Sequence, residues 1–259
     1  MGTASAQGQI WGARAKDWAE VQEGMAVPIF ESVLQETAVD SRTSILDIGC
    51  GSGIFCEMAA KRGARVSGLD ASELLLAIAR ERAQDGDFRT GEMEELPYAD
   101  QTFDVVTGFS SFQFAASPVK ALQEARRVSR TGAVVVAVFG KPEENESTAI
   151  VKAMGSILPP PPPGAPGPYA LSADGALEAL AITAGMTPAT VKTVTCPMDY
   201  RDEKTALRGF LSTGPAIRAI QVSGEDVVRD AILKALAPFK TSSGGYHLGN
   251  SFRYMIATA

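Results

Sequence analysis

The sequence has few cysteines and few histidines. Its 259 residues include three cysteines, at positions 50, 56 and 196, and a single histidine, His247. The cysteines have neither the density of a disulfide scaffold nor the spacing of a zinc site, so we expect no structural metal. This cysteine usage is typical of a reducing compartment, and we expect a cytoplasmic protein.

The sequence also lacks an excess of basic charge and any long hydrophobic run. A net charge of −6 argues against the basic surface that binds nucleic acid or anionic lipid. No apolar run reaches the roughly 18 residues of a membrane span, and the first residues lack the basic-then-apolar pattern of a secretory leader. We therefore expect a small-molecule partner, with no nucleic acid and no membrane span.

Apolar strand patterns alternate with helical periodicity through the first half of the chain. We expect strands at 44–49, 64–70, 87–92, 102–110 and 132–140, and helices at 53–63, 72–84 and 117–129. Ser72 is a candidate N-cap, and Pro118 suits a first helical turn. This alternation predicts an α/β fold with a parallel sheet and helices on both faces.

The remaining segments predict a lid and a cap on a single domain. Residues 14–38 read as two short helices, because Pro28 should break or restart the helix. After Gly140 we expect helices at 143–157 and 172–186, a strand at 189–200, two or three helices in 202–240 and a last strand at 251–259. The proline-rich segment 158–172 reads as a stiff surface connection. The predicted core is 40–140, 172–200 and 251–259, with a helical lid at 10–38 and cap segments at 141–171 and 201–250.

The stretch "LDIGCGSGIF", residues 46–55, places three glycines directly after a strand. Glycines there let backbone amides and a helix N-terminus approach a ligand closely. The spacing is GxGxG, whereas a dinucleotide fingerprint requires GxGxxG, and Ile54 occupies the place of its third glycine. Asp47 ends the strand and would repel a pyrophosphate, so a cationic ligand is favoured.

A second acid, Asp70, ends the next strand, 21 residues after Gly49. In a right-handed βαβ unit the two strand ends meet at one edge of the sheet. The Asp70 carboxylate could accept hydrogen bonds from both hydroxyls of a ribose. Alternatively, it is only an acid that favours the helix start at Ser72. Together the two acids favour a nucleoside that carries positive charge.

The segments "ILDIGCGSG", "GLDASELLLAIARERA", "DFRTGEMEELPYADQTFDVVTGFSSFQF" and "ALQEARRVSRTGAVVVAVFG" resemble successive motifs of class I S-adenosylmethionine-dependent methyltransferases. The resemblance is to the small-molecule group that includes the ubiquinone and menaquinone biosynthesis enzymes. It covers residues 45–140 and implies a Rossmann-like seven-stranded sheet whose last strand, "SFRYMIATA", inserts antiparallel. The turn "RVSRTGA" departs from the family's usual "RVLKPGG" without touching the chemistry.

The resemblance also implies roles for particular residues toward S-adenosylmethionine. The methionine part would be held by Asp47 and the loop residues Gly49, Cys50, Gly51 and Gly53, and the ribose by Asp70. Ala71 and Leu75 would border the adenine, Glu92 would accept from its amino group, and the Met93 amide would reach a ring nitrogen. Phe109 and Ser110 would face the amino acid end. Trp11 and Trp18 lie in the segment that covers the cofactor in relatives, so Trp18 is a candidate contact, although both rings could simply anchor a helix.

A sulfonium methyl is already activated, so the protein mainly has to align an acceptor and exclude water. His247 is the candidate base if the acceptor needs one, because histidine titrates near neutral pH; a solvated or structural role is the alternative. Candidates for orienting the acceptor are Gln113, Glu144, Tyr169, Tyr200 and Tyr246.

The sequence disfavours several targets. The place after the fourth strand reads "GFSSFQF", which is neither the Asn/Asp-Pro-Pro-aromatic segment of amino-group nucleic-acid methylation nor the Pro-Cys of pyrimidine methylation. We therefore expect an S-adenosylmethionine-dependent methyltransferase that acts on O, N or C of a small metabolite. The alternatives are other chemistry with the same cofactor, a non-catalytic binding partner and an NAD-type oxidoreductase, which the loop spacing disfavours.

Overall fold

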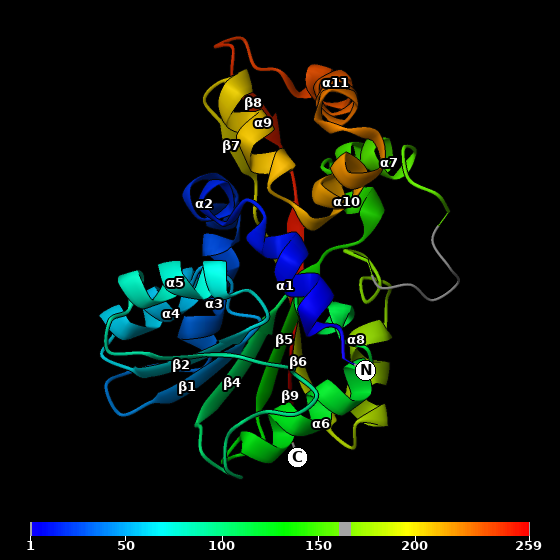
Figure 1. Cartoon of the computed structure of the whole chain (residues 1–259). Helices are drawn as coiled ribbons and strands as arrows, with labels where there is room; N and C mark the ends of the chain where they lie inside the picture. Colours follow the sequence, from blue (N-terminus) through cyan, green and yellow to red (C-terminus); the bar gives the residue numbers. More distant parts are fainter. Residues whose placement is uncertain (1, 161–166, 259) are drawn as a thin grey trace.

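The computed structural model describes residues 2–160 and 167–258, and a seven-stranded sheet organises most of them (Figure 1). The sheet order is β3-β2-β1-β4-β5-β9-β6, and all strands run parallel except β9, which is antiparallel to both neighbours. The predicted Rossmann-like sheet with an antiparallel last strand is confirmed. The strands are β1 (Ser44–Ile48), β2 (Arg65–Asp70), β3 (Asp87–Thr90), β4 (Val105–Phe109), β5 (Val134–Phe139), β6 (Thr187–Thr195) and β9 (Ser251–Thr258).

The strand order reverses its direction at β1. From β1 the chain proceeds outward through β2 and β3, and then returns to β4 on the other side of β1. At such a switch point the connections leave on opposite faces of the sheet and open a crevice at the carboxyl ends of the strands. The fold thus places any ligand beside the ends of β1, β2 and β4.

Helices cover both faces of the sheet, as predicted. The face with α3 (Val27–Glu36), α4 (Ile54–Lys61) and α5 (Glu73–Arg82) buries Phe30, Phe55 and Leu76. The face with α6 (Pro118–Val128) and α8 (Ala176–Thr183) buries Leu122 and Leu177. Two predicted helix starts are confirmed, because Ser72 Oγ accepts a hydrogen bond from the Leu75 amide and Pro118 stands in the first turn of α6.

The N-terminal segment has more helical elements than predicted. It contains α1 (Ala4–Gly12), α2 (Ala15–Asp17), a π-helical turn η1 (Trp18–Gln22) and a 3₁₀ turn η2 (Glu23–Ala26) before α3. Pro28 was expected to break or restart the helix, and it stands in the first turn of a new helix, α3, where its missing N–H costs no hydrogen bond. The irregularity comes earlier, in η1 and η2.

A helical cap stands over the carboxyl edge of the sheet (Figure 1). It has its own apolar core, in which Ile150, Phe210 and Ile232 are buried. The expected helix at 143–157 is divided into η4 (Pro142–Glu144) and α7 (Thr148–Gly155). The other cap elements are α9 (Glu203–Leu211), α10 (Gly214–Ser223), α11 (Glu225–Leu236), η5 (Ala237–Phe239), β7 (Met198–Tyr200) and β8 (Tyr246–Leu248).

The predicted strand at 189–200 is two strands. β6 ends at Thr195, and β7 pairs antiparallel with β8 in the cap instead of continuing the main sheet. Pro197 lies between them and has no N–H for a sheet ladder, so the strand cannot run on. The stiff connection predicted at 158–172 falls partly on residues 161–166, which lie outside the described residues.

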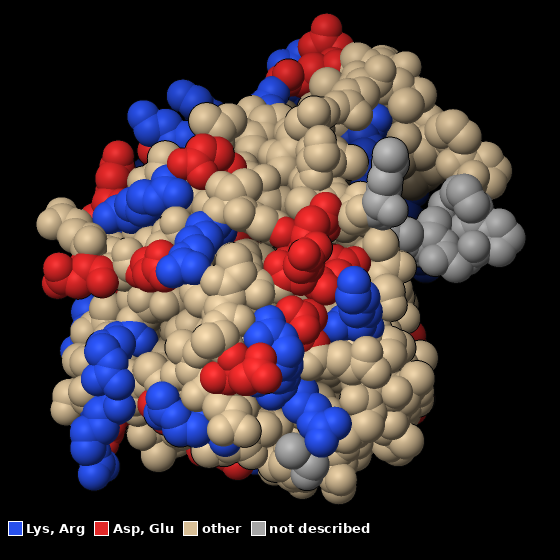
Figure 2. Space-filling view, turned by 60° about the horizontal axis from the view of Figure 1, so that its bottom comes forward, with Lys and Arg blue, Asp and Glu red and all other residues tan. Residues whose placement is uncertain are grey.

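Charged side chains of both signs are interspersed on the face shown in Figure 2, and no continuous basic patch is visible there. No helix in residues 2–160 and 167–258 is both long enough and apolar enough to cross a membrane. Among the same residues, no group of three or more His, Cys, Asp or Glu side chains is arranged to hold a metal ion.

Candidate functional site

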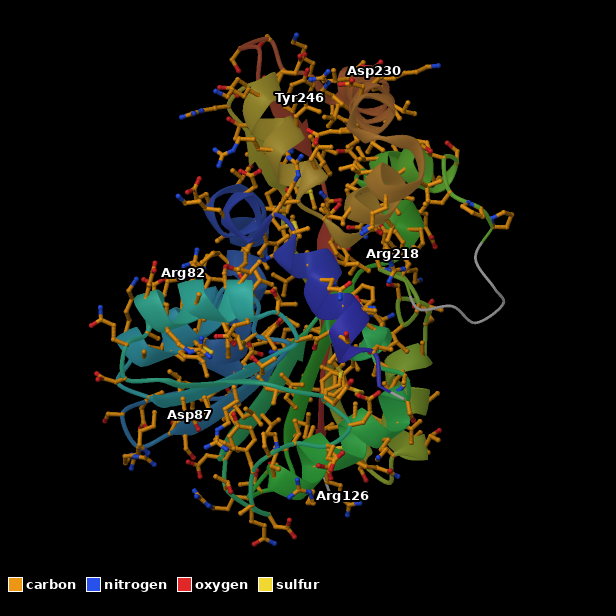
Figure 3. The ribbon with its side chains drawn as sticks, in the orientation of Figure 1. Arg82, Asp87, Arg126, Arg218, Asp230 and Tyr246 are labelled. Carbon is orange, nitrogen blue, oxygen red and sulfur yellow. The ribbon has the colours of Figure 1, made fainter. Side chains whose placement is uncertain are left out.

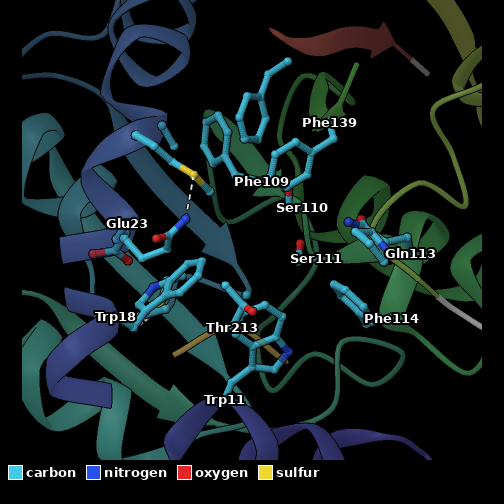
Figure 4. A pocket seen from close by; sticks show the side chains of 18 of the residues that line it. Trp11, Trp18, Glu23, Phe109, Ser110, Ser111, Gln113, Phe114, Phe139 and Thr213 are labelled. Atoms are coloured by element: carbon cyan, nitrogen blue, oxygen red, sulfur yellow. Dashed lines mark hydrogen bonds between the residues drawn. The ribbon is translucent and has the colours of Figure 1, made fainter. Parts of the chain in front are cut away.

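A cavity lies at the switch point between β1 and β4, enclosed by the sheet edge, the N-terminal helices and the cap (Figure 4). Its lining comes from the ends of β1, β2, β4 and β5, from the start of β9, from α1, η1, η2 and α3, and from α7, β7, α9 and α10. Eleven of the thirteen predicted cofactor residues line it: Trp18, Asp47, Gly49, Cys50, Gly51, Asp70, Ala71, Leu75, Met93, Phe109 and Ser110.

The glycine loop after β1 requires glycine at each of its three positions. Gly49, Gly51 and Gly53 have φ angles of 75°, 56° and 80°, a region that other L-residues rarely adopt. A Cβ atom on Gly49 would lie 2.3 Å from the Ser111 Cβ. The bare backbone of the loop therefore forms one wall of the cavity.

Gly53 differs from the other two glycines because it does not line the cavity. It precedes α4, and a Cβ atom there would lie 2.7 Å from the Ala79 Cβ on α5. The resemblance assigned it to the cofactor, but in the structure it permits close packing of α4 against α5.

Asp47 is the buried acid at the end of β1. Its Oδ1 accepts a hydrogen bond of 2.7 Å from Thr107 Oγ1 on the neighbouring strand β4, and only 2% of the residue is exposed. Burial is the main cause that raises the pKa of Asp47 to about 7; the bond from Thr107 acts in the opposite direction, and the nearby carboxyls of Glu23 and Asp70 add to the rise. The carboxylate therefore favours a cationic group in the cavity.

Asp70 holds the loop as well as facing the cavity. One carboxylate oxygen accepts a hydrogen bond of 2.9 Å from the Gly51 amide, and the other accepts one of 2.8 Å from the Ser72 amide. A carboxylate has about four acceptor positions, so each oxygen keeps capacity for a ligand hydroxyl. Burial raises the pKa of Asp70, and the backbone hydrogen bonds oppose that rise.

A third acid of the cavity, Glu23 of η2, is buried and was not predicted as a site residue from the sequence. Its carboxylate accepts hydrogen bonds from the Ser52 amide (3.1 Å), from the Ser52 hydroxyl and from the Arg82 guanidinium (2.6 Å). Burial raises the pKa of Glu23, and the bonds from Ser52 and Arg82 oppose that rise. Its Oε1 would lie only 2.9 Å from a Cβ atom on Gly51, so this acid lies directly against the glycine loop.

Helix α1 closes one side of the cavity. A Cβ atom on Gly8 would lie 2.2 Å from the Ala71 carbonyl oxygen, so only glycine lets the helix approach the turn after β2. Trp11 and Trp18 both line the cavity, with ring centroids 5.1 Å apart in an edge-to-face arrangement (Figure 4). Both tryptophans thus belong to the N-terminal helical segment and face the cavity.

Glu92 is not in the cavity, contrary to the assignment that the resemblance implied. Its Oε1 accepts a hydrogen bond of 3.0 Å from the Ala4 amide, at the start of α1. A carboxylate is a favourable partner for the unpaired amides of a helix N-terminus. Glu92 therefore holds the start of α1, whereas its neighbour Met93 lines the cavity.

Ser110 and Gln113 stand at the cavity wall after β4, opposite Trp18 and Glu23 (Figure 4). Ser110 has a φ angle of +50°, which is uncommon for a residue other than glycine. The Ser110 hydroxyl and both polar atoms of the Gln113 amide are buried without a hydrogen-bond partner. Such unpaired groups in a cavity mark places where a ligand can bind.

Of the other candidates for acceptor contacts, only Tyr169 lines the cavity, and its hydroxyl is hydrogen-bonded to Thr148 Oγ1 at 2.8 Å. Glu144 belongs to a shallow depression beside Asn250. Tyr200 is buried in the cap and donates a 2.8 Å hydrogen bond to Gln22, while Tyr246 pairs with Glu203 and lies high in the cap (Figure 3). These three predictions are not supported by the geometry.

His247 lies outside the cavity. It is on β8, its side chain is 56% exposed, and its Nδ1 lies 2.7 Å from Asp199 Oδ1 on β7. Alternate residues of a strand point to opposite sides, so its buried neighbours Tyr246 and Leu248 face the cap core while His247 faces solvent. The predicted base is therefore out of reach of a reacting group in the cavity.

Residues 46–137 match the family model described as a methyltransferase domain. The ubiquinone biosynthesis O-methyltransferase of Hahella chejuensis is 35% identical over 111 residues, which is 41% of this chain and 47% of that protein. The malonyl-[acyl-carrier protein] O-methyltransferase of Erwinia pyrifoliae is 28% identical over 185 residues, 71% of this chain and 66% of that protein. The YcgJ protein of Bacillus subtilis has a crystal structure that matches with a TM-score of 0.60 at 17% identity, covering 88% of this chain and 97% of that one.

The match to the family model begins within β1 and ends within β5, so it contains the glycine loop and both acids of the strand ends. The chain spans about half to two thirds of the length of the two curated relatives. The sheet order with an antiparallel β9 is that of the same fold. This chain therefore contains a class I S-adenosylmethionine-dependent methyltransferase domain, distantly related to those of the ubiquinone and malonyl-carrier methyltransferases.

Proposed function

We propose that the protein transfers the methyl group of S-adenosylmethionine to an O, N or C atom of a small molecule that binds in the same cavity. The observation that carries this proposal is the meeting of the glycine loop with Asp47 and Asp70 at one end of a partly enclosed cavity. The two curated relatives carry names of methyltransferases, one of a ubiquinone precursor and one of a carrier-bound malonyl group. We also propose the cytoplasmic location that the cysteine usage suggests.

The residues at this end of the cavity fit the cofactor chemically. S-adenosylmethionine carries a sulfonium and an ammonium group, and the buried carboxyl of Asp47 and the partly exposed carboxyl of Asp70 offer the opposite charge, while Glu23 is paired with Arg82. The positive φ angles of Gly49 and Gly51 leave a cradle without side chains for the methionine part. Asp70 keeps free acceptor positions for the ribose hydroxyls, and Ala71, Leu75 and Met93 offer an apolar border for the adenine.

When bound, the cofactor supplies a methyl group already activated by its sulfonium. The acceptor atom would form a bond to the methyl carbon while the carbon–sulfur bond breaks and its electrons stay on sulfur. The chain contributes alignment and exclusion of water, through the lid α1 and the cap. Within the described residues the cavity lining contains no histidine, so an acceptor hydroxyl has no imidazole base beside it.

Two alternatives use the same cavity. A non-catalytic partner would bind the cofactor without turnover, and a cofactor-dependent rearrangement would leave the methyl group in place. The non-catalytic alternative is less favoured, because the cavity continues beyond the glycine loop into an apolar part that has room for a second molecule. The product of the reaction separates methyl transfer from a rearrangement.

Methyl transfer can be tested with S-adenosylmethionine that carries a deuterated methyl group and a panel of small phenols, amines and enols. Methylation predicts formation of S-adenosylhomocysteine together with a product that contains the label. Binding of the cofactor with no consumption, or a product that lacks the label, would contradict methyl transfer and favour one of the alternatives. Asp47→Asn provides the matched control, since it should lose cofactor binding without a change in shape.

A further inference from the structure

The cavity has two chemically different halves. All three of its ionisable acids, Glu23, Asp47 and Asp70, lie at the glycine loop, where the cofactor is proposed to bind. The other half, between the sheet edge and the cap, is formed largely by apolar side chains: Phe30, Phe109, Phe139, Val151, Met154, Met198, Phe210 and Phe252. The acceptor would therefore lie in an apolar chamber.

No Lys, Arg or His lines the cavity in the part of the chain that the structure describes. A carboxylate or phosphate on the acceptor would be buried there without a counterion, which is strongly unfavourable. A cationic acceptor is also disfavoured, because it would lie in the apolar half while the sulfonium occupies the acidic half. The charge arrangement thus favours an uncharged acceptor.

The polar side chains around the apolar half are nearly all engaged within the protein. Ser147 Oγ donates to Asn250, Thr213 Oγ1 donates to the Phe210 carbonyl, and the Tyr169 hydroxyl is paired with Thr148. Gln22 is also engaged, since its Oε1 accepts a hydrogen bond from Tyr200.

Gln113 is the exception. It is 3% exposed and lines the cavity, yet neither its Nε2 nor its Oε1 has a hydrogen-bond partner. A buried amide without partners is costly, and that cost is removed when the side chain turns toward the cavity and a ligand supplies a donor and an acceptor. The Ser110 hydroxyl, three residues earlier, is unpaired as well.

We infer that the acceptor is an uncharged, largely apolar molecule whose hydroxyl or carbonyl group hydrogen-bonds to Gln113, and that Gln113 determines specificity for that group. This inference rests on the proposed methyl transfer, because it takes the acidic half of the cavity as the cofactor site. The side chain of Gln113 orients the acceptor and selects against molecules that lack a polar group.

The inference can be tested with four probes of one shape: para-pentylphenol, its analogues with a terminal carboxylate or a terminal amine, and pentylbenzene. Trp11 and Trp18 are the only two tryptophans of the chain and both line the cavity, so their fluorescence reports occupancy. Each probe is titrated into protein saturated with S-adenosylhomocysteine and into cofactor-free protein. We expect the neutral phenol to bind at least about tenfold more tightly than either charged analogue and about two- to tenfold more tightly than pentylbenzene.

Two variants, Gln113→Leu and Gln113→Met, whose side chain is closer in shape to glutamine, distinguish a loss of acceptor specificity from a loss of folding. Each variant should bind S-adenosylhomocysteine as the wild type does and should lose the preference for the phenol over pentylbenzene. A preference for a charged analogue, or a phenol preference that survives both variants, would overturn the inference. Failure of the wild type to bind S-adenosylhomocysteine would instead contradict the proposed function, and the cofactor-free titrations would still measure the acceptor preference.

Discussion

Thr107 Oγ1 donates a hydrogen bond of 2.7 Å to Asp47 Oδ1, and the two residues stand opposite each other in the register of β4 and β1. The bond fixes a buried carboxyl at the mouth of the glycine loop. Burial nevertheless raises the pKa of Asp47 from the ordinary 3.8 to about 7. The ionised form of Asp47 is thus unfavourable for the stability of the folded protein, and an acid kept at such a position is typical of functional sites.

The first prediction concerns Asp47 and pH. Between about pH 4 and pH 7 the folded cofactor-free protein holds a proton on Asp47 that the unfolded chain has released, so this group lowers the free energy of unfolding as the pH rises through that window. Asp47→Asn removes the charge and keeps the acceptor for Thr107. At pH 8 the cofactor-free variant should be more stable than wild type by about 1 to 3 kcal/mol, while its affinity for S-adenosylmethionine falls.

Denaturant unfolding at pH 5 and pH 8 measures this effect. The stability gain should be present at pH 8 and much smaller at pH 5, where Asp47 is already protonated. Asp230→Asn, on the exposed face of α11 (Figure 3), is the matched control and should change stability by less than about 0.5 kcal/mol. A variant that is less stable than wild type at pH 8 would refute the unfavourable burial of Asp47.

A second prediction concerns Gly51. Its φ angle of 56° disfavours any side chain, and a Cβ atom would lie 2.9 Å from the Glu23 carboxylate. Gly51→Ala should lower stability by about 1 to 2 kcal/mol and weaken cofactor binding. Gly155→Ala, at the end of α7 with open space around it, should be neutral or slightly stabilising. Thermal unfolding and calorimetry of both variants check this, and equal behaviour would argue against a conformational requirement at Gly51.

The lid provides a third prediction. Gly8→Ala places a methyl group 2.2 Å from the Ala71 carbonyl oxygen, so α1 must move away from the turn after β2. Interface changes act mainly on dissociation rates, and we expect S-adenosylhomocysteine to dissociate at least about fivefold faster. Stopped-flow tryptophan fluorescence measures this rate. Gly24→Ala, with no atom within 4 Å of the new methyl group, is the control; identical rates in the two variants would show that α1 is not a lid.

A fourth prediction concerns His247. Its pair with Asp199 joins two exposed side chains and contributes little to stability. His247→Ala should leave both cofactor affinity and methyl-transfer rate unchanged, because the ring faces solvent on the far side of β8. Lower turnover with intact cofactor affinity would restore the histidine as a candidate base.

The segment from β1 to β5 could be predicted because its information is local. The switch between strand and helix periodicity, the cap at Ser72 and the acids at two strand ends all follow from neighbouring residues. The order of strands then brings Asp47 and Asp70 to one edge. The fold, and the meeting of the glycine loop with the two strand-end acids, could therefore be predicted from the sequence.

The parts that could not be predicted depend on contacts between distant segments. Glu23 reaches Arg82 across 59 residues, and Ala4 reaches Glu92 across 88. Nothing in the sequence near Glu23 distinguishes it from an exposed acid, although a glutamate four residues before the apolar start of α3 was a weak signal. The candidates in the cap, Tyr200 and His247, were chosen by residue type alone, and the β7–β8 pairing that turns them toward or away from the core was not visible.

The central claim is that the cavity binds S-adenosylmethionine, and calorimetric titration of the protein with S-adenosylmethionine, S-adenosylhomocysteine and NAD tests it most directly. We predict micromolar binding of both adenosyl compounds, no binding of NAD, and an affinity about 5- to 100-fold weaker in Asp70→Ala, where the acceptor for the ribose is lost. Binding of NAD alone, or an Asp70→Ala variant with wild-type affinity for both adenosyl compounds, would contradict the account.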